Sequence, residues 1–170
     1  ETDNKQRGPN RFLFWEGNDR PKNLGTPEFF FEASSKHLGE WDSLCNDAGL
    51  PIVGPRIIQI LTEIAPDDVE FLDVQIATRQ GELVGYKLLC ILNAINGLDH
   101  ERSEYTLIAE TEEIGGFRRL EYVPSCLGDL QLARDAEYLP HILVGEELQE
   151  RFVTAGIRGV ELYLPEEHLG

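Results

Sequence analysis

An apolar run that stops abruptly constrains the fold more than any other feature of the sequence. Residues 86–95, YKLLCILNAI, place apolar side chains on both faces of an extended strand, and Gly97 then precedes the charged segment DHERSEY at 99–105. Apolar faces on both sides are typical of a central strand that other elements cover. A buried helix fits the same run, because periodicity does not separate the two at this length. In either case a core element ends at a charged surface turn, since unpaired charges are costly to bury.

Two segments of the chain share a strand–helix–strand pattern. In the first, apolar side chains recur at helical spacing after Pro55, a residue suited to a first helical position, and residues 69–76 alternate as a strand. A shift of 91 residues superposes Gly54 on Gly145 and repeats the pattern in LVGEELQERFVTAGIRGVELYL. An internal duplication explains this match, and convergent placement of helix-start and helix-end residues is the alternative.

Shorter segments complete an α+β assignment. RFLFW at 11–15 and FFFEA at 29–33 are predicted strands, and 34–50 is irregular or weakly helical. YTLIA at 105–109 and FRRLEYV at 117–123 are strands joined by a hairpin-like connection. We therefore expect a mixed, mostly antiparallel sheet with two strand–helix–strand units. We expect one globular unit, in which an N-terminal strand and loop segment, 1–49, packs on a main domain, 50–170.

Charge is the strongest compositional feature. The chain has 15 Lys and Arg against 31 Asp and Glu, a net charge of -16, and most of the excess lies after residue 50. Such a field repels nucleic acid and anionic lipid and speeds encounter with a basic partner, so we expect no nucleic-acid and no membrane partner. The longest apolar run is also far shorter than the roughly 20 residues that cross a bilayer. Solubility alone is the other interpretation of the charge.

No motif of the sequence indicates catalysis, a metal or a cofactor. The four histidines are isolated, and the three cysteines form no Cys-x-x-Cys pair. The sequence also lacks a nucleophile signature and a glycine-rich phosphate loop. We therefore predict no catalytic residues, no metal and no cofactor, and the sparse cysteines favour a reducing cytoplasm.

The order of the motifs resembles immunity family eleven of the bacterial polymorphic-toxin systems. PIVGPR, VEFLDV, GYKLLCILNAINGLDHERSEY and YLPHILVGEELQERFVTAGIRGVELYLP carry the resemblance over about residues 50–165, and ERSEY at 101–105 is its most specific part. The chain departs from the family at Lys87, Cys90, Gly54 and Gly145. At the two glycines the family frequently has a helix-capping serine, which glycine replaces tolerably.

The resemblance implies a bacterial cytoplasmic protein that binds and blocks one cognate toxin as a monomer in a 1:1 complex. Polymorphic toxins are often nucleases with basic clefts, which an acidic inhibitor would suit. A deaminase, an ADP-ribosyl-transferring toxin or a peptidase fits the resemblance as well. Two other classes stay open from the residues alone: an enzyme on an unfamiliar α+β scaffold, and a module that pairs with itself through an edge strand.

Two groups of residues are the candidates for toxin binding and for structural support. The expected toxin-binding residues are acids around the ERSEY segment and two tryptophans: Asp99, Glu101, Glu104, Glu110, Glu112, Glu113, Trp15 and Trp41. The expected structural residues are Gly54, Pro55, Arg102, Tyr105 and Gly145. The irregular stretches 16–28 and 110–116 are equal candidates for the contact, because interface segments often vary while the motif residues hold the scaffold.

Overall fold

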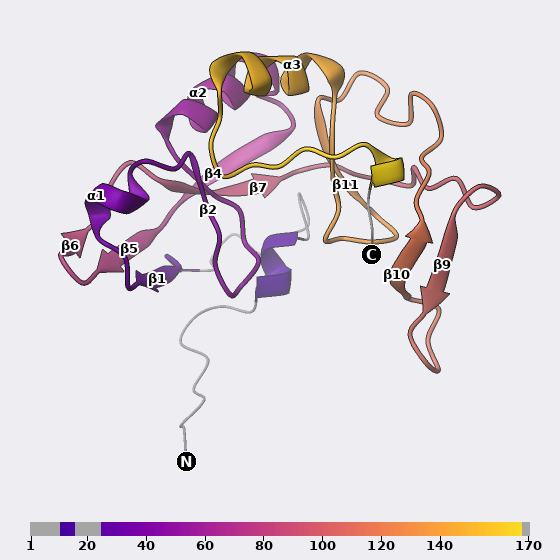
Figure 1. Ribbon diagram of the computed structural model, residues 1–170, viewed down its shortest axis with the longest axis horizontal. Coiled ribbons are helices and arrows are strands. Elements are labelled where there is room, and N and C mark those ends of the chain that lie inside the picture. The colour runs from indigo at the N-terminus through magenta and orange to yellow at the C-terminus, as the bar shows by residue number, and fades with distance from the viewer. Residues whose placement is uncertain (1–10, 16–24, 168–170) are drawn as a thin grey trace.

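The computed structural model describes residues 11–15 and 25–167 of the chain (Figure 1). The helices are η1 (Arg11–Trp15), α1 (Ser35–Leu38), α2 (Pro55–Ile64), α3 (Glu146–Ala155) and η3 (Pro165–Glu167). The strands are β1 (Glu28–Phe31), β2 (Ser43–Leu44), β3 (Ile52–Val53), β4 (Val69–Asp73), β5 (Gln75–Thr78), β6 (Gly81–Glu82), β7 (Lys87–Ile91), β8 (Ala94–Ile95), β9 (Glu104–Leu107), β10 (Ile114–Arg119), β11 (Leu132–Asp135) and β12 (Ile142–Val144).

The strands of the described residues form four small sheets. Their orders are β2-β3-β7-β4, β1-β5-β6, β12-β11-β8 and β10-β9. The pairs β1–β5 and β11–β8 are parallel, and the other pairs are antiparallel. The predicted α+β class with a mixed, mostly antiparallel arrangement is therefore confirmed.

The apolar run forms the central strand β7. Leu88, Leu89, Cys90 and Ile91 are all buried, and β7 lies between β3 and β4. Leu89 and Ile91 pack in the core beneath the two long helices, whereas Leu88 and Cys90 pack on the opposite face with Phe14. The strand interpretation is confirmed and the helix alternative is wrong, because each face of β7 meets its own apolar layer.

Gly97 follows this strand because the chain after β10 passes very close to it. A Cβ at Gly97 would lie 2.9 Å from the Sγ atom of Cys126 and 3.4 Å from the ring of Tyr122. A side chain there would have to displace the Cys126 side chain, because 2.9 Å is closer than van der Waals contact, while the Tyr122 ring would stay at about contact distance. The glycine that ends the apolar run is thus required by packing between two distant segments.

The two long helices lie side by side over one face of the sheet that contains β7 (Figure 1). The predicted helix after Pro55 is confirmed, and its counterpart 91 residues later has the same length of 10 residues. Each begins after a glycine whose N–H is bound by the strand region upstream: Gly54 donates to the Asp42 carbonyl at 2.7 Å, and Gly145 donates to the Gln131 carbonyl at 2.8 Å.

The loop after each helix binds the segment that leads into the other helix. After α2, the buried Asp68 carboxylate accepts from the N–H groups of Gln131 and Leu132 at 2.8 and 3.1 Å. After α3, the Arg158 carbonyl accepts from the N–H groups of Asp42 and Ser43 at 2.9 and 3.1 Å. This reciprocal exchange supports an internal duplication, because convergent caps alone do not require the two units to interlock.

The structure differs from the expected elements in several places. The strand expected at 69–76 is divided into β4 and β5, which belong to different sheets, and the strand expected at 117–123 is shifted to 114–119. Residues 11–15 form the 3₁₀ helix η1 rather than a strand, and the side chain of Phe14 is buried in the core. Residues 160–164 form no strand, because they pair with no neighbouring strand among the described residues. Strand β11 was not predicted, since its sequence LARD contains a buried Arg134 and a buried Asp135 that mimic a surface segment.

Replacing Asp68 by alanine should lower the free energy of unfolding by about 3 kcal/mol, because two backbone N–H groups would lose a charged acceptor. Asp67→Ala, at the exposed neighbouring acid, should change it by less than about 0.5 kcal/mol. Urea denaturation of both variants measures the difference. Equal effects at the two positions would contradict the role of Asp68 as the link between the units.

The Gln131 amide takes the place of the serine cap that the family frequently has before α3. Its Oε1 atom accepts from the Leu148 N–H at 3.3 Å, and a Cβ at Gly145 would lie 2.4 Å from that Oε1. Gly145→Ser should therefore destabilise the chain by about 1 kcal/mol, and by clearly less in a Gln131→Ala background, where the serine can cap the helix and only the contact with the Cα of residue 131, at 3.1 Å, remains. A thermal-unfolding double-mutant cycle tests the coupling, and additive effects would refute it.

Candidate functional site

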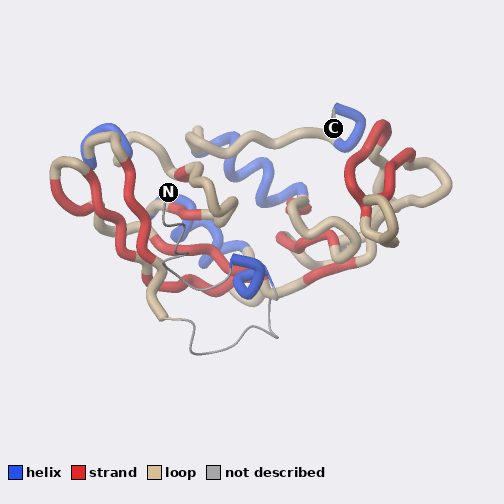
Figure 2. Tube along the Cα trace, turned by 90° about the horizontal axis from the view of Figure 1, so that it is seen from below, coloured by secondary structure: helices blue, strands red, loops and turns tan. Residues whose placement is uncertain are grey.

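The β9–β10 hairpin lies at one end of the molecule, and α1 and β6 lie at the other (Figures 1 and 2). The tip of the hairpin, residues 108–113, is held by hydrogen bonds within the turn. The Ile108 N–H donates to the Glu113 carbonyl at 2.9 Å, and the Thr111 N–H donates to the Ile108 carbonyl at 3.0 Å. Glu110 adopts φ 65°, a left-handed conformation that closes the turn. The tip is therefore an ordered feature of the surface.

The hairpin carries four of the six predicted acids, all of them exposed. Glu104 lies in β9, where it faces Arg119 at 3.6 Å, and Glu110, Glu112 and Glu113 lie at the tip. Within the described part of the chain, no basic side chain forms an ion pair with the three tip acids. The side chains of Leu107 and Ile108 are also exposed beside them. The tip thus presents uncompensated negative charge next to apolar surface.

Asp99 has a different environment from the hairpin acids. Its side chain is only 18% exposed, and its Oδ1 accepts from the N–H groups of Glu101 and Arg102, both at 3.1 Å. These contacts hold the turn that leads into β9. Glu101 is exposed on this same turn, so it remains accessible whereas Asp99 is occupied within the fold.

Neither tryptophan lies on the hairpin. Trp15 is half-buried in η1 beneath the Arg134 guanidinium, 5.2 Å from the ring centroid. Trp41 is 38% exposed after α1, and Arg158 lies 4.8 Å above its ring. The structure therefore does not bring the tryptophans and the acids into one surface, and residues 16–24 of the candidate stretch 16–28 lie outside the described residues.

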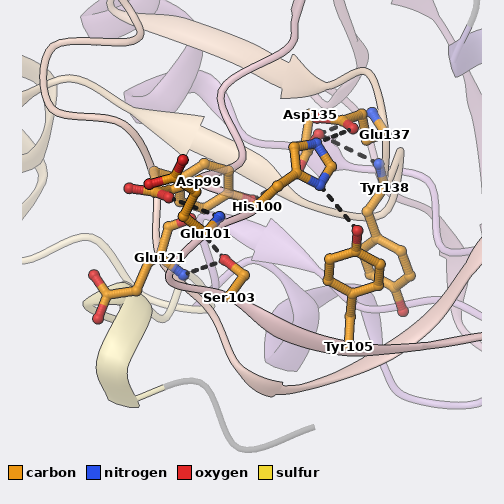
Figure 3. A network of polar contacts seen from close by, with 10 residues as sticks. Asp99, His100, Glu101, Ser103, Tyr105, Glu121, Asp135, Glu137 and Tyr138 are labelled. Atoms are coloured by element: carbon orange, nitrogen blue, oxygen red, sulfur yellow. Dashed lines mark hydrogen bonds and ion pairs between the residues drawn. The ribbon is translucent and has the colours of Figure 1, made fainter.

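The ERSEY segment is tied to the chain that leaves β10 (Figure 3). The buried Ser103 hydroxyl donates to the Glu121 carbonyl and accepts from the Glu121 N–H, both at 3.0 Å. Arg102 is exposed and lies 3.6 Å from the Asp99 carboxylate, while its carbonyl accepts from the Arg119 side chain. These contacts fix the two strands of the hairpin at their base.

Tyr105 connects the hairpin to the loop after β11 (Figure 3). Its hydroxyl lies 2.9 Å from Nδ1 of His100, whose Nε2 lies 2.7 Å from a carboxylate oxygen of Glu137. The Tyr105 ring also packs edge-on against Phe117, which packs edge-on against Tyr138. Such aromatic pairs stabilise beyond their buried area, so the hairpin is anchored by a continuous cluster.

A buried polar group that the sequence did not indicate supports this anchor. Asp135 is fully buried, and it accepts from the N–H groups of Glu137 and Tyr138 and from the Tyr122 hydroxyl, the last at 2.8 Å. The Tyr122 hydroxyl also lies 3.1 Å from Nδ1 of His141. Burial, together with the Asp135 hydrogen bond, raises the pKa of Tyr122 above its ordinary value. No periodic signal in the sequence reveals this group, because Tyr122 is separated in the chain from the other members, which lie within 135–141.

Arg134, the neighbour of Asp135, is buried as a cation without a carboxylate partner among the described residues. Its guanidinium donates to the Leu139 carbonyl at 2.7 Å and covers the Trp15 ring. Burial lowers the pKa of Arg134 to about 10. The ring face and the carbonyl dipole therefore stabilise this charge in place of an acid.

An enzyme, a metal-binding protein and a membrane-spanning protein would each need features other than the hairpin. An enzyme that uses paired carboxylates would line a pocket with converging acids, and a pocket of about 640 Å³ in the described structure has Glu161 as its only acid. No group of three or more potential metal ligands occurs among the described residues. Within the same residues, no helix is long and apolar enough to span a membrane.

Ser103→Ala should lower the free energy of unfolding by about 1–2 kcal/mol, because the Glu121 N–H would lose its acceptor. The Glu121 carbonyl would lose one of two donors and keep the Asp99 N–H at 2.9 Å. Amide exchange in β9 and β10 should also become faster. Arg102→Ala provides the control, since its exposed ion pair contributes at most about 0.5 kcal/mol. If Arg102→Ala lowered the free energy of unfolding more than Ser103→Ala, the Arg102–Asp99 ion pair, and not the Ser103 hydroxyl, would be the contact that holds the turn.

Comparison with known proteins gives one family match. A family model described as Immunity protein family (Imm11) matches residues 3–164, nearly the whole chain. No curated protein matches the chain.

Proposed function

The chain belongs to the Imm11 immunity protein family, and we propose that it neutralises a basic, nuclease-type toxin by covering the toxin surface with its β9–β10 hairpin. Immunity proteins of this kind protect a cell by binding a toxin. The partner is one cognate toxin, bound in the cytoplasm as a 1:1 complex. Binding alone is sufficient for this role, so no group of the chain needs to react.

The acidic tip of the hairpin is the observation that carries the proposal. Glu110, Glu112 and Glu113 are exposed at the end of the molecule and form no ion pair with described basic residues. An acidic surface raises the rate of encounter with a basic one and disfavours partners of the same sign. Nucleases bind polyanions and therefore carry basic clefts, which matches the sign of this tip.

The hairpin is also held rigidly enough to act as an inhibitory element. Ser103 fixes its base, and Tyr105 and Phe117 anchor its inner face on the loop after β11. A surface that is ordered before binding loses less conformational entropy when the complex forms. The exposed Leu107 and Ile108 add apolar contact area beside the acids. The acids of the hairpin can therefore guide the approach of a basic partner, and its exposed apolar side chains can stabilise the complex when they are buried against that partner.

Replacing Glu110, Glu112 and Glu113 together by glutamine should slow association with the cognate toxin domain about tenfold at low ionic strength. The difference should shrink as salt rises, because exposed charges are screened over about 8–10 Å at 0.1–0.15 M. Stopped-flow association kinetics at several salt concentrations measure both effects. Cells that make the toxin should lose protection in parallel.

The matched control removes three acids from the other end of the molecule. Glu28→Gln, Glu40→Gln and Glu82→Gln change the net charge equally but lie in or near β1, α1 and β6. The control should leave the association rate within about twofold of the unmodified chain. Equal slowing by both triple variants would show that net charge alone acts, and a rate independent of salt would rule out the electrostatic proposal.

A further inference from the structure

A pocket with a volume of about 640 Å³ lies directly beyond the base of the β9–β10 hairpin. Its walls come from the stretches 120–127, 140–144 and 161–165, which are far apart in sequence. The first of these stretches continues from β10, which ends at Arg119. The C-terminal segment runs toward the same side of the molecule as the hairpin (Figures 1 and 2). Pocket and hairpin therefore lie toward the same end of the molecule.

Exposed apolar side chains gather around this pocket. Val123, Ile142, Tyr163 and Leu164 all line it, and their exposed fractions lie between 39% and 62%. Single exposed apolar side chains are ordinary on protein surfaces, but several that share one hollow indicate an interaction site. The volume also falls within the range of about 300–1,000 Å³ that is usual for binding pockets.

The polar and charged residues that line the pocket determine which charge a bound group can carry. The Tyr122 hydroxyl already donates to Asp135 and contacts His141, so these groups are partnered within the fold. Among the described lining residues, Glu161 is the only acid, and none is a lysine or arginine. Glu166 and Glu167 follow in η3, beside the lining residue Pro165. Arg119 precedes the lining residue Leu120, but it pairs with Glu104 on the hairpin. An apolar pocket whose lining holds an acid and no lysine or arginine is complementary to an apolar group carried by a basic segment.

We propose that this pocket receives a large apolar side chain, flanked by lysine or arginine, from the protein partner. The inference rests on the proposed function, since it gives the acidic hairpin's partner a second point of contact. Interface energy concentrates in a few buried anchors, with aromatic residues foremost among them, while charged rims set rate and orientation. The hairpin then steers the partner, and the pocket holds it.

The test uses the full chain and three short peptides, followed by amide chemical shifts in NMR. A blocked peptide of two lysines, tryptophan and two lysines should bind at the pocket and shift amides in 120–127, 140–144 and 161–165. Peptides with alanine in place of tryptophan, or glutamates in place of the lysines, should bind about tenfold more weakly or worse. Leu164→Lys should weaken the first peptide about tenfold, because it places a cation at the rim.

Val153→Lys is the matched control, since Val153 is 70% exposed on α3 and does not line the pocket. It adds the same charge and should leave peptide affinity within about twofold. Equal affinity for the acidic peptide, equal affinity for the alanine peptide, or shifts confined to other surfaces would overturn the proposal. Concentration-dependent dimerisation that broadens the pocket amides would overturn it as well, because a second copy would then be the occupant.

Binding to the cognate toxin domain separates this inference from the proposed function. Loss of toxin affinity in Leu164→Lys but not in Val153→Lys would support both. Unchanged toxin affinity in Leu164→Lys would overturn the pocket contact and leave the immunity function standing. Peptide binding as expected, without any toxin complex, would refute the proposed function and leave the preference of the pocket for basic, apolar segments intact.

Discussion

The reciprocal hydrogen bonding between the two helical units is the constraint on which the rest of the structure depends. Asp68 binds the start of β11, and the Arg158 carbonyl binds the segment that begins β2, so neither unit is complete without the other. Strand β11 in turn supplies Asp135, the buried acceptor beneath the hairpin. Because buried backbone groups must find partners, a disturbance at Asp68 reaches the hairpin base through β11.

Residues that support the fold and exposed acids occupy neighbouring positions of the same motif. Asp99 and Ser103 are used inside the fold, whereas Glu101 and Glu104 are exposed between and beside them. A family-typical segment can therefore serve mainly to set the angle and rigidity of a hairpin. The tip contributes few contacts to the core, because Glu110, Glu112 and Glu113 are exposed.

Much of the fold follows from local patterns in the sequence. The run at 88–91 was predictable as core because both of its faces are apolar, although a buried helix stayed possible until the pairing of β7 was known. The long helices were predictable because their apolar stripe and their start signals coincide. The aromatic-rich sequence at 11–15 wrongly predicted a strand, because Phe14 is as deeply buried in the 3₁₀ helix η1 as it would be in a strand. The sequence did not predict β11, because a segment with an arginine and an aspartate reads as exposed unless the buried partners of these charges are known. Of the candidate site, the acids on the hairpin were identified, while the separation of Trp41 from them was not.

The sequence by itself determined the α+β class, the two long helices and the negative charge, since these are carried by composition and periodicity, and its motif order carried the resemblance to the family. Only the tertiary structure decided that Ser103 and Asp135 support the hairpin, that Gly97 is required by Cys126, and that four apolar side chains from three segments surround one pocket. The reason is physical. These features depend on contacts between residues distant in the chain, and such contacts leave no periodic trace in a single sequence.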